Sequence, residues 1–401
     1  MPFAQLVVAF TALIVWLYLV VARGMFWRVR GFDDDLARRE PITNWPTVIA
    51  IVPARNEAAT IAESITSLLQ QNYPGQFSVI VVDDHSEDAT ARRAQQAAAD
   101  LGAESRTQIL TAPPLLPGWT GKLWALNEGI SHATGRGAAP LRPSSATLPI
   151  SASPDFFWFT DADITHAPDT LLRLVSRAAR GHLDMTSLMV LLQAKTLPER
   201  ALIPAFLFFF LKLYPPKWIA DPKAKTAGAA GGCILLRSAA LHRIGGLAAI
   251  RSEVIDDCAL ARAVKRTGGK IWMGLTRRSL SLRAYNSFAE IRDMITRTAF
   301  TQLHYSPVLL LAVIAAMLLI YIAPVALLFT RNPATQILAA CSWALMSLLY
   351  LPTLRFYSLS PLWAPFLPAI AAFYSYATLL SAIRYYLGRG AHWKGRSQAH
   401  S

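Results

Sequence analysis

Cysteine is scarce in this chain. Its 401 residues include only three cysteines, Cys233, Cys258 and Cys341, and their spacing is not that of a metal site. The cysteine content therefore excludes a cysteine-ligated metal centre, and it is typical of a reduced domain in the cytoplasm.

Acidic residues are missing from both ends of the chain. Residues 1–24 and 306–401 contain no Asp or Glu, although the whole chain has 25 acidic residues. About 20 consecutive apolar residues are enough to cross the hydrocarbon core of a bilayer. The composition therefore predicts a transmembrane helix within residues 1–24. It also predicts transmembrane or re-entrant helices within residues 306–383, in three apolar runs at 306–330, 334–353 and 361–383.

Basic residues around these runs predict the orientation of the chain. The first run is followed, not preceded, by arginines, which is typical of a retained anchor rather than a cleaved signal peptide. Because basic flanks stay in the cytoplasm, the juxtamembrane linker at 25–46 and the residues after it lie on the cytoplasmic side. The basic tail at 384–401 conflicts with four full spans, which would place it outside. One of the last two runs is then a candidate re-entrant or interfacial element, and the sequence leaves open which one.

A dense stripe of Lys and Arg with interleaved aromatic residues is also missing. The net charge of +14 instead reflects a moderate excess spread over the chain, as expected of a domain that faces anionic lipid. The charge distribution therefore argues against a nucleic-acid partner.

A further apolar run at residues 201–211 is too short to cross a bilayer. Lys212, Tyr214, Lys217 and Trp218 follow it, and these residue types favour a membrane surface. The pattern predicts an interfacial helix near 198–219, with a core helix as the alternative.

Short β-branched runs alternate with helical stretches from residue 47 onward. Strands are expected at 47–52, 77–82 and near 108–110, and helices at 57–70 and 89–101. This alternation predicts an α/β fold with a parallel sheet covered by helices. In such sheets, ligands bind at the carboxyl ends of the strands.

Polar clusters follow three of the expected strands. Pro53-Ala54-Arg55-Asn56-Glu57 follows the first strand, Asp83-Asp84 the second, and Asp161-Ala162-Asp163 a later strand at 156–160. Each cluster alone is consistent with a turn or a helix cap. Together they are expected to converge on one cleft, where two carboxylates two residues apart suit a divalent cation.

A glycine-flanked segment lies between the second and third clusters. Residues 118–129 are expected to form a turn at Gly118 and a short helix that ends at Gly129, with Lys122 near the helix start. A lysine beside free backbone N–H groups is a phosphate-binding arrangement. The spacing is not that of a Walker A loop, which argues against an ATPase. Residues 137–154, rich in Ser, Pro and Ala, are expected to form a surface insertion.

The second half of the chain has its own acidic cluster. Small residues at 227–232 precede a strand at 233–236, and Asp256 and Asp257 precede a helix that runs to about residue 266. A helix cap needs one carboxylate, so the pair has two interpretations. One is a cap, and the other is a base that deprotonates the hydroxyl of an acceptor.

These motifs resemble, in the same order, those of family 2 glycosyltransferases of the GT-A fold, over residues 47–305. The resemblance implies that Asp161 and Asp163 hold Mg²⁺ or Mn²⁺ and that Asp257 is the general base, with Asp256 in place of the more usual Glu before it. It also implies a group of residues that bind the nucleotide sugar: Pro53, Arg55, Glu57, Asp84, Lys122 and Asp161.

Within that family, residues 117–125, 203–206 and 297–303 are similar to the bacterial glycosyltransferases associated with hopanoid biosynthesis, and more distantly to ceramide glucosyltransferases. Lipid-linked relatives usually carry Gln/Arg-x-x-Arg-Trp before the C-terminal membrane region. Here Arg297 and Gln302 occupy that neighbourhood, so an acceptor or product site is expected at these two residues.

The resemblance implies an inverting glycosyltransferase, a hexosyltransferase, that is a multi-pass protein of the bacterial inner membrane with its catalytic domain in the cytoplasm. The expected donor is a nucleotide sugar, with uridine as the expected base. The expected acceptor is a lipid, with a hopanoid as the candidate that the resemblance suggests. Two alternatives stay open: a processive polysaccharide synthase, and a membrane scaffold that retains the fold without turnover.

Overall fold

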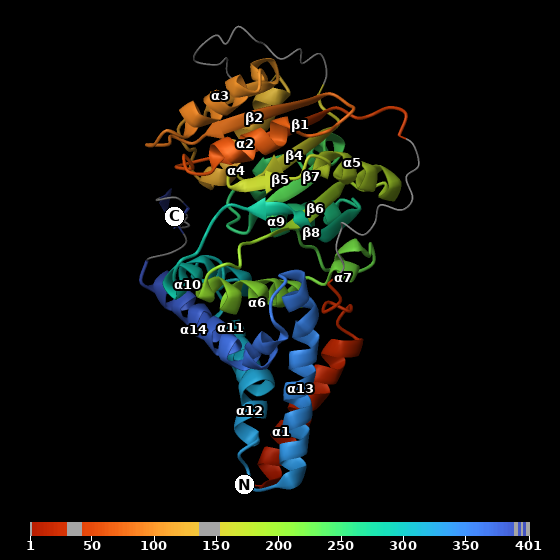
Figure 1. Cartoon of the computed structure of the whole chain (residues 1–401), viewed down its shortest axis with the longest axis vertical. Helices are drawn as coiled ribbons and strands as arrows, with labels where there is room; N and C mark the ends of the chain where they lie inside the picture. Colours follow the sequence, from red (N-terminus) through yellow and green to blue (C-terminus); the bar gives the residue numbers. More distant parts are fainter. Residues whose placement is uncertain (1, 30–41, 136–152, 389–391, 394–395, 398–401) are drawn as a thin grey trace. The chain divides into compact units, whose positions relative to one another are not determined.

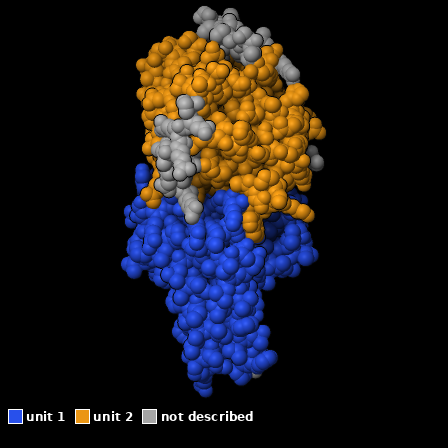
Figure 2. Space-filling view, turned by 90° about the vertical axis from the view of Figure 1, so that its right-hand side faces the viewer, with its two compact units in different colours: residues 1–29, 193–217, 285–391 blue, residues 30–192, 218–284, 392–401 orange. Residues whose placement is uncertain are grey.

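The computed structural model describes residues 2–29, 42–135, 153–388, 392–393 and 396–397 (Figure 1). Part of the expected linker, most of the expected insertion and half of the basic tail lie outside these residues. The described chain divides into two compact units (Figure 2), of which unit 1 comprises residues 1–29, 193–217 and 285–391, and unit 2 comprises residues 30–192, 218–284 and 392–401. Residues 193–217 and 285–305, which we expected in the glycosyltransferase domain, thus group with the apolar helices.

Unit 2 is built on a mixed eight-stranded sheet. The strands in spatial order are β3 (Thr107–Thr111), β2 (Phe77–Asp83), β1 (Val48–Ala54), β4 (Phe156–Thr160), β7 (Cys233–Arg237), β6 (Met185–Leu191), β8 (Ile271–Ser281) and β5 (Ile164–His166).

The expected parallel direction holds for most of this sheet. Strands β3, β2, β1 and β4 pair in parallel, and so do β6 and β8, whereas β7 is antiparallel to β4 and β6, and β5 is antiparallel to β8. Only residues 161–163 connect β4 to β5, which lies at the far edge of the sheet and runs in the opposite direction. The short connection turns the chain at the end of β4 and presents its side chains there.

Helices surround the sheet of unit 2. They are α2 (Ile61–Leu69), α3 (Thr90–Asp100), η2 (Glu104–Arg106), α4 (Gly121–Ala133), α5 (Thr170–Gly181), α8 (Ser238–Arg243), η3 (Leu247–Ile250) and α9 (Asp256–Arg266), while α7 (Pro216–Ala220) crosses the boundary between the units. Two short strands, β9 (His392–Trp393) and β10 (Arg396–Ser397), pair with each other.

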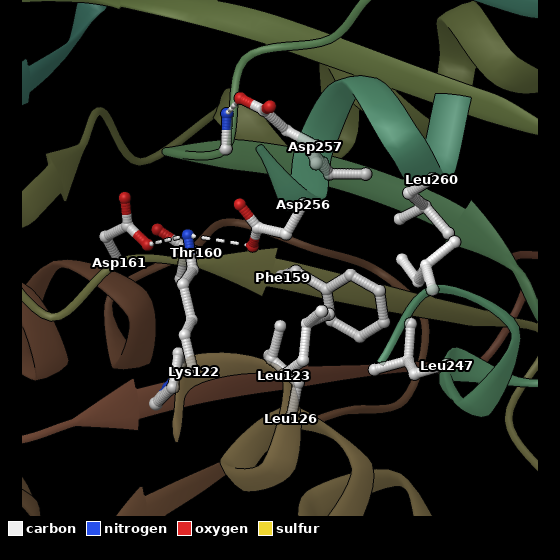
Figure 3. A pocket seen from close by; sticks show the side chains of 14 residues that line it. Lys122, Leu123, Leu126, Phe159, Thr160, Asp161, Leu247, Asp256, Asp257 and Leu260 are labelled. Carbon is white, nitrogen blue, oxygen red and sulfur yellow. Dashed lines mark hydrogen bonds and ion pairs between the residues drawn. The ribbon is translucent and has the colours of Figure 1, made fainter. Parts of the chain in front are cut away.

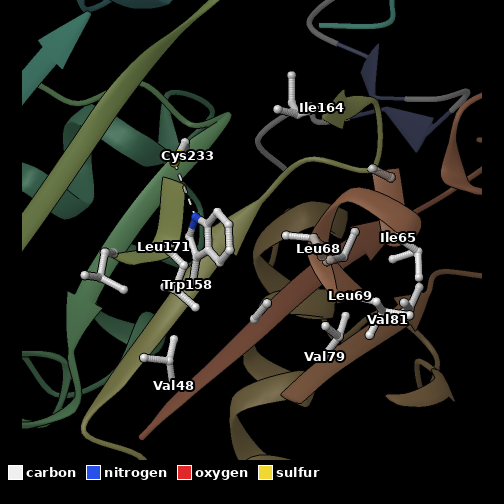
Figure 4. Close-up of a cluster of buried hydrophobic side chains, with 14 of the residues drawn as sticks. Val48, Ile65, Leu68, Leu69, Val79, Val81, Trp158, Ile164, Leu171 and Cys233 are labelled. Atoms are coloured by element: carbon white, nitrogen blue, oxygen red, sulfur yellow. Dashed lines mark hydrogen bonds between the residues drawn. The ribbon is translucent and has the colours of Figure 1, made fainter. Parts of the chain in front are cut away.

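Helix α2 shows why these segments fold as expected. Its apolar residues Ile61, Ile65, Leu68 and Leu69 recur at helical spacing and are all buried. They pack with side chains of β1, β2 and β4 (Figure 4), where the indole N–H of Trp158 donates to Cys233 Sγ at 3.3 Å. Each fully buried aliphatic side chain of this kind contributes roughly 1.5–3 kcal/mol.

Helix α4 does not end at Gly129 as expected but continues to Ala133. A Cβ atom at Gly129 would lie 2.5 Å from Ile51 Cγ2 on β1 and 3.1 Å from Val82 Cγ2 on β2. The glycine therefore allows the helix to approach the sheet closely and does not stop the helix. The expected turn at Gly118 is present, with a φ of +79° that suits glycine.

Unit 1 contains helices and no strand among its described residues. Its elements are α1 (Pro2–Val21), α6 (Leu197–Leu213), α10 (Phe288–Thr296), η4 (Thr301–Leu303), α11 (Pro307–Met317), the π-helical segment η5 (Leu318–Ile322), α12 (Ala323–Leu327), α13 (Pro333–Phe356), η6 (Pro361–Phe366) and α14 (Leu367–Tyr386). Among the described residues, four helices are long and apolar enough to cross a membrane: Pro2–Val21, Pro307–Leu327, Pro333–Phe356 and Pro361–Tyr386.

Candidate active site

A pocket in unit 2 brings together side chains from distant parts of the sequence (Figure 3). Asp161 comes directly after β4, Lys122 lies in the first turn of α4, and Asp256 and Asp257 lie in the first turn of α9. Pro53 of β1 also lines this pocket. Five of the expected site residues therefore lie around one pocket.

Lys122 joins two of the acidic clusters. Its Nζ atom lies 2.9 Å from Asp161 Oδ1 and 3.4 Å from Asp256 Oδ2. Burial alone lowers the pKa of Lys122, but the carboxylates of Asp161 and Asp256 outweigh it and hold this pKa well above its ordinary value. Lys122 is therefore a fixed positive charge at the centre of the pocket.

Asp257 is held in place by the backbone. The N–H of Gly231 donates to its Oδ2 at 2.9 Å, and the N–H of Cys258 donates to its Oδ1 at 2.7 Å. Burial and the charge of Asp256 raise the pKa of Asp257 to about 6, although Lys122 and the two backbone N–H groups act to lower it. A carboxylate with this pKa is ionised near neutral pH and accepts a proton more readily than an ordinary aspartate.

Gly231 leaves room between the lysine and the carboxylate. A Cβ atom at this position would lie 3.2 Å from Lys122 Nζ and 3.4 Å from Asp257 Oδ2. Any larger residue would therefore reduce the space in which a ligand could approach both groups.

A second set of expected residues lies where β1 and β2 end. The guanidinium of Arg55 lies 3.9 Å from the buried Asp84 carboxylate and donates to the backbone carbonyls of Asp84 and His85. The backbone N–H of Asp84 donates to Ala54 O at 2.8 Å, which holds the starts of the two loops together.

Side chains of the second loop bind the backbone of the first. Three N–H groups after β1 donate to them: Asn56 to Ser86 Oγ at 2.9 Å, Glu57 to Thr90 Oγ1 at 2.8 Å, and Ala58 to Asp88 Oδ2 at 3.1 Å. Ser86 connects the two loops, whereas Asp88 connects them through Oδ2 and also accepts at Oδ1 from the N–H of Thr90, the first residue of α3, at 2.9 Å. Glu57 is consequently fixed through its backbone.

Asp161 and Asp163 supply two carboxylates in the turn between β4 and β5. The backbone carbonyl of Asp163 accepts from Leu282 N at 2.7 Å, which ties this turn to the residues after β8. Hard oxygen donors fit Mg²⁺ or Mn²⁺, and Mg²⁺ is often bound by one or two carboxylates together with substrate phosphates. Throughout the described chain, no group of three or more His, Cys, Asp or Glu side chains could hold a metal ion. The residues therefore fit a cation whose other ligands come from a substrate.

Comparison with known families agrees with this geometry. Residues 49–245 match the model of the family described as Glycosyl transferase family 2. This chain contains a family 2 glycosyltransferase domain. The matched segment includes the loops after β1 and β2, Lys122 and Asp161-Ala162-Asp163, while Asp256 and Asp257 lie beyond it.

Two known proteins illustrate the likeness. A probable glycosyltransferase, YdaM from Bacillus subtilis (strain 168), is 26% identical over 128 residues, and the match spans only 30% of each chain. The solved structure of the mannosyltransferase PcManGT from Pyrobaculum calidifontis, in complex with GDP-Man and Mn²⁺, covers 94% of this chain and 99% of its own, with a TM-score of 0.55 and 19% identity. The second likeness shows the fold: a GT-A domain with additional apolar helices.

Unit 2 also contains a buried network that sequence reasoning missed. Thr160, directly before Asp161, donates to Gly232 O at 3.0 Å and lies 2.8 Å from His166 Nε2, while His166 Nδ1 lies 2.8 Å from Ser279 Oγ. Because the Thr160 hydroxyl proton goes to Gly232, Nε2 must donate to Thr160, and Nδ1 then accepts from Ser279. Burial lowers the pKa of His166 to about 3, so the ring is neutral, as this pattern requires.

This network connects the two sides of the pocket. Thr160 fixes the start of the Asp161-Ala162-Asp163 turn, and Gly232 follows the glycine whose N–H binds Asp257. The one sequence feature that could have indicated this network is a histidine three residues after Asp163. In the structure, that histidine lies on β5, which pairs with β8.

Apolar side chains on one side of the pocket were also missed. They are Leu123, Leu126, Phe159, Ile234, Leu247, Ile250 and Leu260. Their spacing in the sequence is that of ordinary core residues, so only the fold reveals that they border the acidic cluster.

The two residues expected at the acceptor or product site belong to unit 1. The hydroxyl of Tyr214 donates to Gln302 Oε1 at 2.9 Å, and Arg297 directly follows α10. The pocket is lined by residues of unit 2 alone, so the roles of Arg297 and Gln302 stay predictions.

Proposed function

We propose that this chain transfers a sugar, with inversion, from a nucleotide sugar to a lipid acceptor at the cytoplasmic face of the bacterial inner membrane. The observation that carries the proposal is the position of Lys122 between Asp161 and Asp256, beside a backbone-held Asp257 with a raised pKa. Such a cluster can stabilise a departing diphosphate and accept a proton within one pocket.

The donor would lie along the ends of β1, β2 and β4. Asp84, Arg55 and the loop through Glu57 would seat the nucleoside, with uridine as the base that the family resemblance suggests. Lys122 would exchange carboxylate partners for the diphosphate, because phosphate oxygens compete for an ammonium group. The relative PcManGT was solved with GDP-Man and Mn²⁺, which supports a nucleoside diphosphate sugar as the donor class.

A divalent cation would be held by Asp161 and Asp163 together with the diphosphate. It would supply positive charge to the leaving group and thereby lower the barrier to its departure. Lys122 would add a second positive charge, because the anionic groups around it keep the lysine protonated.

Asp257 would act as the general base. Its carboxylate takes the proton of the acceptor hydroxyl, while the hydroxyl oxygen forms a bond to the anomeric carbon. The bond between that carbon and the diphosphate oxygen breaks, and its electron pair leaves with the diphosphate. Attack from the face opposite the leaving group inverts the anomeric configuration. The two N–H donors from Gly231 and Cys258 would orient the carboxylate for this transfer.

The apolar helices support a lipid as the acceptor. Four helices in the described residues are long and apolar enough to cross a membrane, and apolar side chains border the acidic cluster. A membrane-embedded acceptor needs an enzyme that is held at the lipid surface, and these helices would provide that attachment. A hopanoid is the specific acceptor that the sequence resemblance suggests.

A lipid comparison tests this function. Lipids would be extracted from a strain that lacks the gene and from the same strain complemented with the wild-type chain or with Asp257→Asn. We expect a glycosylated lipid that is present with the wild-type chain and missing in the other two strains. Identical lipid profiles in all three would refute a lipid acceptor, and long sugar chains in the mass spectra would indicate a polymerising synthase instead.

A further inference from the structure

We infer that the fourth apolar segment does not cross the membrane. The segment formed by η6 and α14, which we call the re-entrant segment, enters the bilayer on the side of the glycosyltransferase domain and returns to that side. Only α1, the α11–α12 stretch and α13 then cross. The inference rests on the proposed membrane attachment, and it follows from contacts within unit 1.

The re-entrant segment begins by reversing direction at the end of α13. Ser358 has a φ of +54°, and the N–H of Leu359 donates back to Leu354 O at 2.9 Å. The indole N–H of Trp343 then donates to Pro365 O at 3.0 Å. Helix α13 ends at Phe356, 13 residues after Trp343. At 1.5 Å per residue this separation is about 20 Å along the helix. The chain therefore runs back to the middle of α13 before α14 starts.

Helix α14 next runs along α10. The rings of Phe288 and Phe373 lie 6.2 Å apart near one end of α10, and Ser381 Oγ donates to Thr296 O at 2.5 Å near the other. Arg384 of α14 also forms a salt bridge with Asp293 of α10, with 2.9 Å between Nη2 and Oδ1. Two helices that touch from Phe373 to Arg384 lie at the same depth over most of the length of α10.

Helix α10 cannot lie in the hydrocarbon core of a bilayer. Its nine residues include Glu290, Arg292 and Asp293, and the side chains of Glu290 and Asp293 are exposed. Charged residues are strongly unfavourable at the centre of a bilayer. The helix also starts four residues after the end of unit 2 at Ala284, with no apolar span between them. Helix α10, and with it the second half of α14, therefore lies on the side of the glycosyltransferase domain.

The outer face of α14 fits contact with lipid at this depth. Tyr376, Leu379, Ile383 and Tyr386 recur at spacings of three and four residues and are 51%, 39%, 53% and 63% exposed. They form one apolar stripe on a helix whose other face packs on a charged partner, as in helices that lie in the membrane interface. Helices α1, α12 and α13 also pack against one another (Figure 1), while α14 contacts α10, α11 and η5.

This arrangement removes the conflict over the basic tail. With α1 leading into the cytoplasm, the α11–α12 stretch leads out and α13 leads back. The re-entrant segment then leaves the tail on the cytoplasmic side. Its basic residues Arg384, Arg389, Lys394 and Arg396 agree with the tendency of cationic flanks to stay inside.

Cysteine labelling tests the inference on the full chain. In a Cys341→Ala background, one variant carries Arg331→Cys in the loop between α12 and α13, a second carries Ser358→Cys in the exposed turn between α13 and η6, and a third carries a cysteine appended after Ser401. Spheroplasts are treated with a membrane-impermeant maleimide before or after lysis. The unmodified background gives the baseline, because Cys233 and Cys258 are buried. Each variant must first show the size-exclusion profile of the parent.

The labelling of the three cysteines decides the question. If the re-entrant segment does not cross, Arg331→Cys is labelled in intact spheroplasts, whereas Ser358→Cys and the appended cysteine are labelled only after lysis. Labelling of Ser358→Cys in intact spheroplasts would make α13 the segment that does not cross, and labelling of both Arg331→Cys and the appended cysteine there would mean four crossings. Either result would overturn the inference. If alkaline carbonate extracts the protein from membranes, the proposed membrane attachment has failed, and the re-entrant segment fails with it. Opposite labelling with the sides exchanged would overturn only the orientation of the chain.

Discussion

Replacement of Asp257 by Asn should remove turnover and leave the fold intact. The substitution keeps the shape of the side chain but cannot accept the proton of the acceptor hydroxyl. A general base contributes on the order of a hundredfold to ten-thousandfold, so we expect kcat to fall by about that factor. A loss of this size corresponds to roughly 2.7–5.5 kcal/mol in the activation free energy.

The stability of this variant can also be worked out from the structure. The pKa of Asp257 is raised from its ordinary value of 3.8 to about 6, so ionisation opposes folding, and stability falls as pH rises through this window. Removing the charge therefore favours folding at pH 7 by up to about 3 kcal/mol. The loss of one acceptor for the N–H groups of Gly231 and Cys258 costs about 1–3 kcal/mol. These effects nearly cancel, so the melting temperature should stay close to that of the parent.

The assay is the initial rate of sugar transfer, measured with labelled nucleotide sugar across pH 5 to 7. With a pKa of about 6, roughly one tenth of the Asp257 groups are ionised at pH 5 and nine tenths at pH 7. The kcat/KM of the parent should therefore rise about tenfold over this range. Asp100→Asn, an exposed substitution at the end of α3, serves as the matched control and should keep the parental rate and profile. Near-normal turnover by Asp257→Asn, or a flat parental profile, would refute the assignment.

Four further predictions concern the neighbours of this group. Lys122→Gln should reduce kcat/KM at least about a hundredfold and move the ascending limb of the pH profile to higher pH, because Lys122 lowers the pKa of Asp257; an unshifted limb would contradict the coupling. Gly231→Ala should impair turnover with little change in melting temperature, since its Cβ would lie 3.2 Å from the lysine. His166→Phe should lower the free energy of unfolding by about 1–3 kcal/mol per orphaned hydroxyl and raise the Mn²⁺ concentration needed for half-maximal rate; an unchanged Mn²⁺ requirement would limit the histidine to a structural role. Chelation should abolish transfer, Mn²⁺ or Mg²⁺ should restore it, and Asp163→Asn should weaken this rescue.

Local patterns in the sequence were enough to predict the first half of the glycosyltransferase domain. Strands β1, β2 and β4 are short apolar runs, and the rule that ligands bind at strand ends placed Pro53, Asp84 and Asp161 at one edge. Lys122 was expected near a helix start, and the structure has it in the first turn of α4. These features depend on residues close together in the chain.

Features that depend on distant residues could not be predicted in this way. The partners of His166 include Ser279, 113 residues away, and only the pairing of β5 with β8 brings them together. Likewise, the salt bridge from Lys122 to Asp256 and the Gly231 bond to Asp257 depend on where β7 and α9 pack. The predicted end of α4 was wrong because a glycine is typical of a helix end. In the structure, Gly129 instead allows the helix to pack closely on Ile51.

The most direct test of the account is transfer by the purified full chain. The protein would be incubated with Mn²⁺, a panel of labelled nucleotide sugars, and lipid extracted from the strain that lacks the gene. The account predicts label in one class of chloroform-soluble product with the wild-type chain, and none with Asp257→Asn, although both bind the donor. If the donor binds but no lipid is labelled under any of these conditions, or if Asp257→Asn labels lipid as the wild type does, the account is contradicted.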